Sequence, residues 1–225
     1  MVFEFDIPGV SFFRSPLPLT SQVESDYSYC LPQSLENVAQ TRKHHYVAGR
    51  YCAIQAAKKL GHALPAFGNA ETREPQWPLG FTGSISHSKS MAVSCVSETT
   101  RYKSMGIDTE ELIRTSMATK ISGTVAGPEE LEYLKNLNFE FGFTLLFSAK
   151  EALFKALFPL GRKYIDFKEA ILVSVNQKDN TFVLKLVSNN PAYESYLGDY
   201  KGQYSIVDNN LVSLILIEKD QHVYS

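Results

Sequence analysis

The sequence has few cysteines and no excess of charge of either sign, and both absences exclude classes of protein. Its 225 residues include 3 cysteines, at positions 30, 52 and 95, which lie too far apart for a zinc site or a disulfide framework. We therefore expect a reducing compartment, the cytoplasm. The 22 basic and 24 acidic residues give a formal net charge of −2, so no global positive field attracts nucleic acid or anionic lipid. Any anion site has to be local.

Long hydrophobic runs and targeting signals are also missing. The longest apolar stretches, such as 211–217, fall well short of the ~20 residues that cross a bilayer. The N-terminus MVFEFDIPGV is acidic where an export signal would be basic. No strict repeat or low-complexity tract is present. Because 44% of the residues are hydrophobic, we expect a globular protein with its own core and no membrane span.

Hydrophobic spacing predicts an α+β fold of two similar lobes, residues 1–112 and 113–225. A long amphipathic helix is predicted over 34–60, with Gly61 as its C-terminal cap. Pro128 and Ser148 are favourable first residues for two further helices. Strands are predicted over six segments: 91–96 and 104–107, joined as a hairpin, and 170–175, 181–187, 203–207 and 211–218. Residues 62–84 are interpreted as an ordered loop.

Two carboxylates follow the apolar strand that ends in the sequence MGIDTEEL. Since successive side chains alternate in a strand, Asp108 and Glu110 point to the same side. A pair of hard oxygen ligands of this kind suits Mg²⁺, which also borrows ligands from a substrate phosphate. On its own, however, the pattern is more typical of an acidic surface turn.

The segment FSAKEALFKAL places two lysines and a glutamate on the first turns of a predicted helix. Ser148 and Glu151 match a capping box, and Glu151 with Lys155 is a common stabilising pair one turn apart. A purely structural role therefore explains the segment. A glutamate that binds metal, together with Lys150 and Lys155, is also what a diphosphate site needs.

Small hydroxyl residues and one histidine gather in GSISHS, residues 83–88. The chain lacks a G-x-S-x-G motif, so a serine hydrolase is not favoured. Phosphate binding through serine hydroxyls, backbone N–H groups and the histidine fits better. Arg42 and Arg50 on the first long helix and Arg73 in the loop beyond are either solvated surface charges or ligands of a distant phosphate.

Four motifs occur in a fixed order: AGR (48–50), WPLGFTGSISHS (77–88), GIDTE (106–110) and FSAKEALFKAL (147–157). In this combination they resemble the surfactin- and enterobactin-type 4'-phosphopantetheinyl transferases. The match extends over roughly residues 42 to 157. The resemblance implies a pseudo-symmetric pair of α+β lobes with the active site in the cleft between them.

The resemblance also implies a role for each matching residue. Asp108, Glu110 and Glu151 would bind Mg²⁺ or Mn²⁺, and Asp108, Glu151 and Lys155 would be catalytic. Either Glu151 or a metal-bound water would act as the general base. The coenzyme A ligands would be Arg42, Arg50, Arg73, Ser86, His87, Lys150 and Lys155, with the arginines on the 3'-phosphate and the lysines on the diphosphate.

By the same resemblance, the enzyme would transfer phosphopantetheine from coenzyme A to a serine of an apo acyl or peptidyl carrier protein, releasing 3',5'-ADP. The pathway would be siderophore, nonribosomal peptide, polyketide or fatty-acid synthesis. The carrier would dock at an apolar or basic surface, for which Met117, Lys120 and 139–143 are candidates. Since one chain contains both lobes, a monomer is expected.

Two rival functions share some of these features. A Mg²⁺-dependent phosphodiesterase or nuclease could use the same acids and lysines, but the chain lacks the basic stripe with interleaved aromatic residues of a nucleic-acid enzyme. A binding module without catalysis would leave the GSISHS segment and the three acids unexplained. Truncation of Glu151 separates these functions, because only an enzyme would lose turnover.

Overall fold

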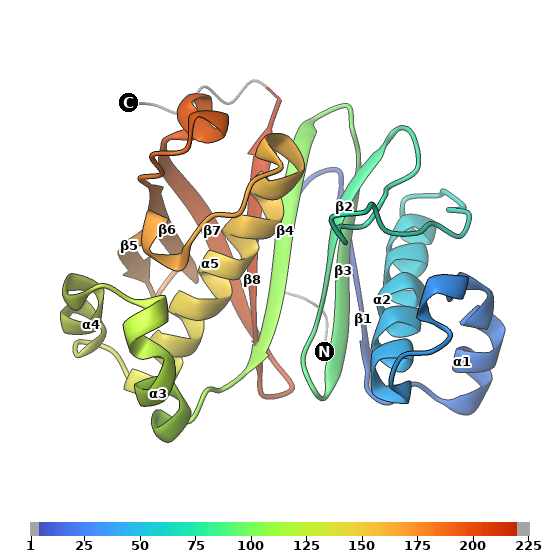
Figure 1. Ribbon diagram of the computed structural model, residues 1–225, viewed down its shortest axis with the longest axis horizontal. Helices are drawn as coiled ribbons and strands as arrows, with labels where there is room; N and C mark the ends of the chain where they lie inside the picture. Colours follow the sequence, from blue (N-terminus) through green and yellow to red (C-terminus); the bar gives the residue numbers. More distant parts are fainter. Residues whose placement is uncertain (1–4, 220–225) are drawn as a thin grey trace.

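The computed structural model describes residues 5–219 and contains two antiparallel sheets, each carrying one long helix (Figure 1). The first sheet has the strand order β1-β3-β2 and the second the order β4-β8-β7-β6-β5. The strands are β1 (Val10–Pro16), β2 (Phe81–His87), β3 (Met91–Glu98), β4 (Tyr102–Glu111), β5 (Ala170–Asn176), β6 (Thr181–Leu186), β7 (Gly198–Val207) and β8 (Asn210–Glu218). The α-helices are α1 (Ser21–Tyr27), α2 (Gln40–Lys59), α3 (Thr115–Val125), α4 (Pro128–Leu134) and α5 (Phe139–Gly161). The predicted α+β class is confirmed.

Helix α2 lies on the three-stranded sheet, mainly over β3. It can approach closely because the side chains that face the sheet are small: Ala48, Cys52, Ala53 and Ala56 are all fully buried. The helix begins at Gln40, six residues after the predicted start at 34. A short 3₁₀ turn, Gln33–Leu35, stands there instead. The predicted end is confirmed, since Gly61 follows with a φ of 84°.

Helix α5 lies on the five-stranded sheet, over β4 and β8. It starts at Phe139, where the side chain of Asn138 accepts a hydrogen bond from the Phe141 N–H at 3.1 Å. The predicted start at Ser148 is therefore wrong, and that serine is fully buried within the helix. The apolar segment before Ser148 continues the helix by packing on the sheet. Pro128 does begin α4, as predicted.

Strands β5 to β8 form the antiparallel ladder that the sequence predicts. The predicted hairpin over 91–107 is wrong, because β3 pairs with β1 and β2 whereas β4 pairs with β8. The chain therefore leaves the first sheet at residues 99–101. The division at 112/113 stays a prediction, although β4 belongs by hydrogen bonding to the C-terminal sheet.

The two sheets share a buried core, with Val93 and Cys95 of β3 packed near Met105 and Ile107 of β4. Strands β2 and β4 consequently run close together where the two sheets meet (Figure 1). None of the helices within residues 5–219 has the length and hydrophobicity needed to span a bilayer. The shared core holds the end of β2 against the end of β4, which is where the polar side chains gather.

Candidate active site

Side chains from three elements meet where β2, β4 and α5 come together. Lys155 Nζ on α5 lies 2.7 Å from Asp108 Oδ1 on β4 and donates a 2.8 Å hydrogen bond to Ser86 Oγ on β2. The Ser86 hydroxyl in turn donates to Asp108 Oδ1 at 2.9 Å. The Lys155 amino group also donates to the carbonyl of Ile107 at 3.2 Å. This network ties the two sheets together at one polar point.

Gly106, in the GIDTE segment, allows α5 to approach β4 this closely. A Cβ atom at this position would lie 1.8 Å from the carbonyl oxygen of Ala152 and 2.7 Å from the amide nitrogen of Ala156. Any side chain would therefore push the helix away from the strand. Because Lys155 reaches Asp108 from this part of the helix, the glycine sets the geometry of the polar network.

Asp108 is nearly buried and only half satisfied. Its side chain is 5% exposed, and Oδ2 has no hydrogen-bond partner among the described residues. The negative charge of Asp108 acts on both Glu110 and Glu151. Burial, followed by the Asp108 charge, raises the pKa of Glu110 to about 7 despite the opposing effect of Lys155. Burial also raises the pKa of Glu151, with Lys155 opposing it.

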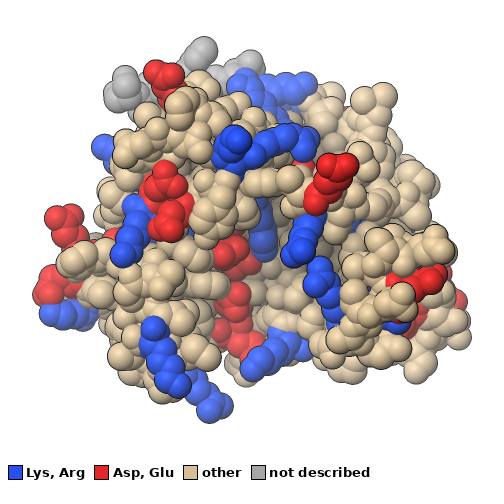
Figure 2. All heavy atoms as spheres, viewed as in Figure 1, with Lys and Arg blue, Asp and Glu red and all other residues tan. Residues whose placement is uncertain are grey.

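The negative charge of Asp108, Glu110 and Glu151 together exceeds the single positive charge of Lys155 beside them. Figure 2 shows acidic atoms running down the middle of the molecule, with basic atoms beside them. Within residues 5–219, no group of three or more His, Cys, Asp or Glu side chains is placed to hold a metal ion as it stands. The unpaired Asp108 oxygen and the raised pKa values of the two glutamates nevertheless fit a hard divalent cation.

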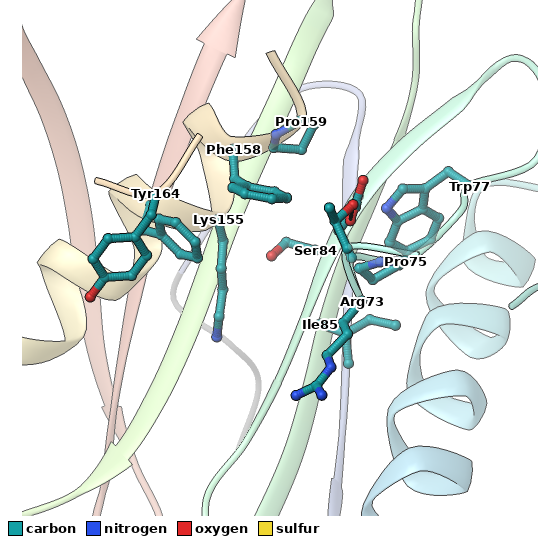
Figure 3. A pocket seen from close by; sticks show the side chains of 13 residues that line it. Arg73, Pro75, Trp77, Ser84, Ile85, Lys155, Phe158, Pro159 and Tyr164 are labelled. Atoms are coloured by element: carbon teal, nitrogen blue, oxygen red, sulfur yellow. Dashed lines mark hydrogen bonds between the residues drawn. The ribbon is translucent and has the colours of Figure 1, made fainter. Parts of the chain in front are cut away.

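A cavity of about 470 Å³ opens above Lys155, between α5, β2 and the loop 72–77. Figure 3 shows Trp77 on one wall and Phe158 and Tyr164 on the other, with the charged ends of Lys155 and Arg73 both pointing downward between them. Arg162 Nη1 crosses between the lobes to Glu74 Oε1 at 2.8 Å. The cavity therefore combines apolar walls with a cationic edge, as expected of a site for a ligand that is charged at one end.

A second cavity, of about 490 Å³, lies beside α2 and shares Arg73, Pro75 and Ile85 with the first. We call it the basic pocket. Its side chains include three arginines and two histidines, and no Asp or Glu contributes to its lining: Arg42, His45, Arg50, Arg73 and His87. This composition suits an anion such as a phosphate.

Two family models match the chain. The 4'-phosphopantetheinyl transferase N-terminal domain matches residues 31–97, and the 4'-phosphopantetheinyl transferase superfamily matches residues 104–207. The chain belongs to the 4'-phosphopantetheinyl transferase superfamily. The gap between the two matches contains the turn at which the chain passes from the first sheet to the second.

The chain is similar to proteins named as 4'-phosphopantetheinyl transferases or as a component of enterobactin synthase. The chain is 33% identical over 132 residues to 4'-phosphopantetheinyl transferase Npt of Nocardia iowensis, covering 58% of this chain and 59% of that protein. It is 38% identical over 125 residues to enterobactin synthase component D of Escherichia coli (strain K12), covering 54% and 58%. The matched part thus spans less than two thirds of either relative. Over 206 residues it is 28% identical to 4'-phosphopantetheinyl transferase Svp of Streptomyces mobaraensis, covering 88% and 82%.

Among solved structures, holo-[acyl-carrier-protein] synthase of Thermotoga maritima has a TM-score of 0.40 and 24% identity. The match covers 52% of this chain and 64% of the Thermotoga maritima chain.

The position of Lys150 differs from what a ligand of the diphosphate requires. Its side chain is only 1% exposed, and its amino group lies 2.8 Å from Glu130 Oε2 and 2.8 Å from the Val125 carbonyl oxygen. Glu130 also accepts hydrogen bonds from the backbone N–H groups of Gly127 and Leu172. The pair joins α4, α5 and β5 inside the C-terminal lobe. This corrects the expected position of Lys150, whose neighbour Lys155 is the lysine at the polar network.

Arg50 lines the basic pocket, but its donors face the loop rather than the cavity. Its Nε donates to the Phe67 carbonyl at 3.0 Å, and Nη2 donates to the carbonyl of Gly68 at 3.2 Å and to the Asn69 side chain. The residue is 3% exposed. A direct contact of Arg50 with the 3'-phosphate stays a prediction, and in this structure the residue holds the loop 67–69.

Three features of the site escape prediction from the sequence. His45 lines the basic pocket, Glu130 holds Lys150, and Arg162 bonds to Glu74 across the cleft. None of them stands in one of the four motifs, and each partner lies at least 20 residues away or on another element. The spacing of hydrophobic residues along the sequence does not indicate which distant polar residues come into contact.

Proposed function

We propose that this chain is a 4'-phosphopantetheinyl transferase that moves phosphopantetheine from coenzyme A to a serine of an apo acyl or peptidyl carrier protein, releasing 3',5'-ADP. The observation that carries the proposal is the network of Lys155, Asp108 and Ser86, which lies between an acid cluster and a basic pocket in a chain of this superfamily. A diphosphate and a separate phosphomonoester, both present in coenzyme A, are the ligands that such a pair of sites accommodates.

In this proposal Asp108, Glu110 and Glu151 hold a divalent cation, Mg²⁺ or Mn²⁺. The cation supplies Lewis-acid neutralisation of the diphosphate oxygens when it is bound. Glu110 and Glu151 have to turn toward the free oxygen of Asp108, since the described side chains do not yet form a complete ligand set. The positive charge of the cation would offset the mutual repulsion of the three carboxylates and so would favour that movement.

Lys155 has the second role. In the structure without ligands, its amino group donates a hydrogen bond to Asp108. The long, flexible side chain can reorient so that the amino group contacts a diphosphate oxygen of the leaving 3',5'-ADP. Ser86, which accepts a hydrogen bond from Lys155 and donates one to Asp108, would bind a phosphate oxygen only by turning its hydroxyl proton away from Asp108. Charge is thus stabilised on the side of the bond that breaks.

The general base has to take the proton of the carrier serine. Glu151 is the candidate, because burial raises its pKa and hence its basicity in the absence of the cation. Its use as a metal ligand lowers that basicity, so a water that it orients is the alternative acceptor. In both cases the proton of the carrier serine moves toward Glu151 on α5.

The basic pocket would take the 3'-phosphate of coenzyme A. Arg42 and Arg73 are exposed and have no competing acid among the pocket residues. His87, the last residue of β2, lines the same pocket as the two arginines. These three side chains can therefore act together on one phosphomonoester.

The carrier would dock beside the acid cluster. A cavity of about 480 Å³ lies there, lined by the end of β4 and the start of α3. Leu112 and Met117 are 46% and 53% exposed at its edge, and Lys89 and Arg114 line it. The 139–143 segment is less suitable, because Phe143 is fully buried and Phe141 packs on Tyr204. A monomeric, cytoplasmic enzyme of siderophore or other peptide synthesis completes the proposal.

The test is the intact mass of an apo peptidyl carrier protein after incubation with the enzyme, coenzyme A and Mg²⁺. A gain of one phosphopantetheine group is expected, and it should be absent with EDTA and with Glu151→Gln. Glu132→Gln is the matched control, since Glu132 is an exposed glutamate on α4 and should leave the transfer unchanged. Consumption of coenzyme A without a mass gain would instead identify a phosphodiesterase.

A further inference from the structure

Two histidine rings lie against each other, tilted, in the lining of the basic pocket. The rings of His45, from α2, and His87, from β2, have centroids 4.2 Å apart with an angle of 37° between their planes. Both line the cavity, so a ligand there contacts the pair rather than one ring. His45 belongs to none of the sequence motifs, and the proposed mechanism does not use it.

The charges around the pair are mostly positive. Helix α2 contributes Arg42, Arg50 and His44, the loop contributes Arg73, α5 contributes Lys155, and the nearest acid is Asp108 of β4. Removal of water by the surrounding protein lowers the pKa of His87 to about 4, with His45 and Lys155 adding to the effect. The pKa of His45 is also lowered, first by burial and then by His44. Without a ligand, both rings are therefore neutral at pH 7.

The arginines alone supply limited charge to a ligand. Two donor nitrogens of Arg50 are already bonded to the loop 67–69. Arg42 and Arg73 remain for direct contact, both on exposed parts of the pocket. A dianionic phosphate placed among these groups favours the charged form of any imidazole within about 4–6 Å.

We propose that His45 is a specificity-determining residue for the phosphomonoester of coenzyme A, and that the adjoining pair His45 and His87 takes up a proton from solvent when that dianion enters the basic pocket. The inference rests on the proposed function, in which the basic pocket holds the 3'-phosphate. One proton is expected rather than two, because a second charge on rings 4.2 Å apart would be repelled by the first. The proton returns to solvent when the ligand leaves.

The consequence is selectivity of the basic pocket for ligands that carry the 3'-phosphate. A ligand with the 3'-phosphate draws a proton onto the pair, whereas a ligand without it leaves both rings neutral. Preference for the 3'-phosphate should therefore increase as the pH falls toward 7, where the phosphomonoester itself, with a pKa of about 6, is still largely dianionic.

Isothermal titration calorimetry with 3',5'-ADP and with 5'-AMP, each without metal and at pH 7 in two buffers of different ionisation enthalpy, counts the protons taken up. The wild-type protein should take up at least about half a proton more with 3',5'-ADP than with 5'-AMP. His45→Gln should lose most of this difference and bind 3',5'-ADP about three- to tenfold more weakly, with less change for 5'-AMP.

His62→Gln is the matched control. The Nε2 atom of His62 lies 2.6 Å from Glu98 Oε1, and His62 neither lines the pocket nor acts on the pKa of His45 or His87. This variant should keep the wild-type proton uptake. Circular dichroism of both variants checks that the fold is retained.

The possible outcomes distinguish a failure of the His45 proposal from a failure of the proposed transferase function. Equal proton uptake for both nucleotides, in a protein that transfers phosphopantetheine to a carrier, overturns the role of His45 and leaves the transferase intact. Uptake that persists in His45→Gln also overturns it. A protein that neither binds 3',5'-ADP nor modifies a carrier overturns both.

Discussion

Lys155 and Asp108 form an ion pair that joins α5 to β4 at the place where the two sheets meet. Their atoms Nζ and Oδ1 are 2.7 Å apart, and the side chains are 26% and 5% exposed. Removal of the lysine therefore leaves a nearly buried carboxylate whose other oxygen already lacks a partner among the described residues. The pair both stabilises the cleft and neutralises part of the acid cluster.

The first prediction concerns this pair. Lys155→Met should lower kcat by at least about 100-fold, because the leaving group loses its cation, and should lower the stability of the metal-free protein by about 2–4 kcal/mol. Mg²⁺ should restore more stability to the variant than to the wild type, since it replaces the lost positive charge. Urea unfolding with and without Mg²⁺ measures this. Lys178→Met, in the exposed turn between β5 and β6, should change neither quantity.

The second prediction is a pH dependence of metal binding. The folded-state pKa of Glu110, about 7, lies above its ordinary value, so the protonated form is favoured and metal-free stability from this group falls as the pH rises through 7. A cation has to displace that proton. The affinity for Mg²⁺ should therefore rise by up to about tenfold per pH unit below pH 7 and level off above it.

Calorimetric titration with Mg²⁺ between about pH 5.5 and 8.5, roughly 1.5 units on each side of neutrality, checks this dependence. Glu110→Gln should bind more weakly and lose most of the slope. An affinity that is constant over the whole range would contradict a role for Glu110 as a ligand that must be deprotonated.

The third prediction tests the close contact of α5 with β4. Gly106→Ala should destabilise the protein by about 2–4 kcal/mol, because its new methyl group would lie 1.8 Å from the Ala152 carbonyl oxygen. Transfer activity should fall as well, since α5 carries Lys155. Thermal unfolding measures the first effect and the carrier mass assay the second.

Gly123→Ala is the matched control for this substitution. Gly123 lies within α3, and a Cβ atom there meets nothing within 4 Å. Alanine favours a helix over glycine by about 0.5–1 kcal/mol, so the control should be unchanged or more stable. A Gly106→Ala protein as stable as this control would mean that α5 does not rest on β4 as described.

The sequence predicts the polar centre of the site better than its surroundings. Asp108 and Glu110 point to one side because side chains alternate along a strand, and Lys155 follows Glu151 by one helical turn; both are local rules. The structure brings Asp108 and Lys155 into contact, and the charges of Glu110 and Glu151 act on the same place. Local spacing could not show that Ser86 joins them, which depends on two sheets sharing a core.

The errors have a common physical cause. The hairpin expected over 91–107 is wrong because the sequence between the two strands resembles a turn, whereas the choice of partner strand depends on residues more than 100 positions away. Ser148 matches a helix cap, yet packing on the sheet extends α5 by nine residues ahead of it. Lys150 matches a motif, and its buried partner Glu130 is invisible to spacing.

The last prediction separates the two lysines of the KEALFK segment. Lys150 and Glu130 form a pair that is 1% and 4% exposed, so the loss of one partner leaves a buried charge. Lys150→Met and Glu130→Gln should each cost about 2–4 kcal/mol, and the double variant should cost less than the sum. A urea double-mutant cycle measures the coupling between them. In the carrier mass assay, at a temperature where all variants are folded, Lys150→Met should retain far more activity than Lys155→Met, because the Lys150 amino group is bonded to Glu130 inside the C-terminal lobe, whereas that of Lys155 lies at the polar network where the diphosphate is proposed to bind. Equal loss in the two variants would return Lys150 to the diphosphate site.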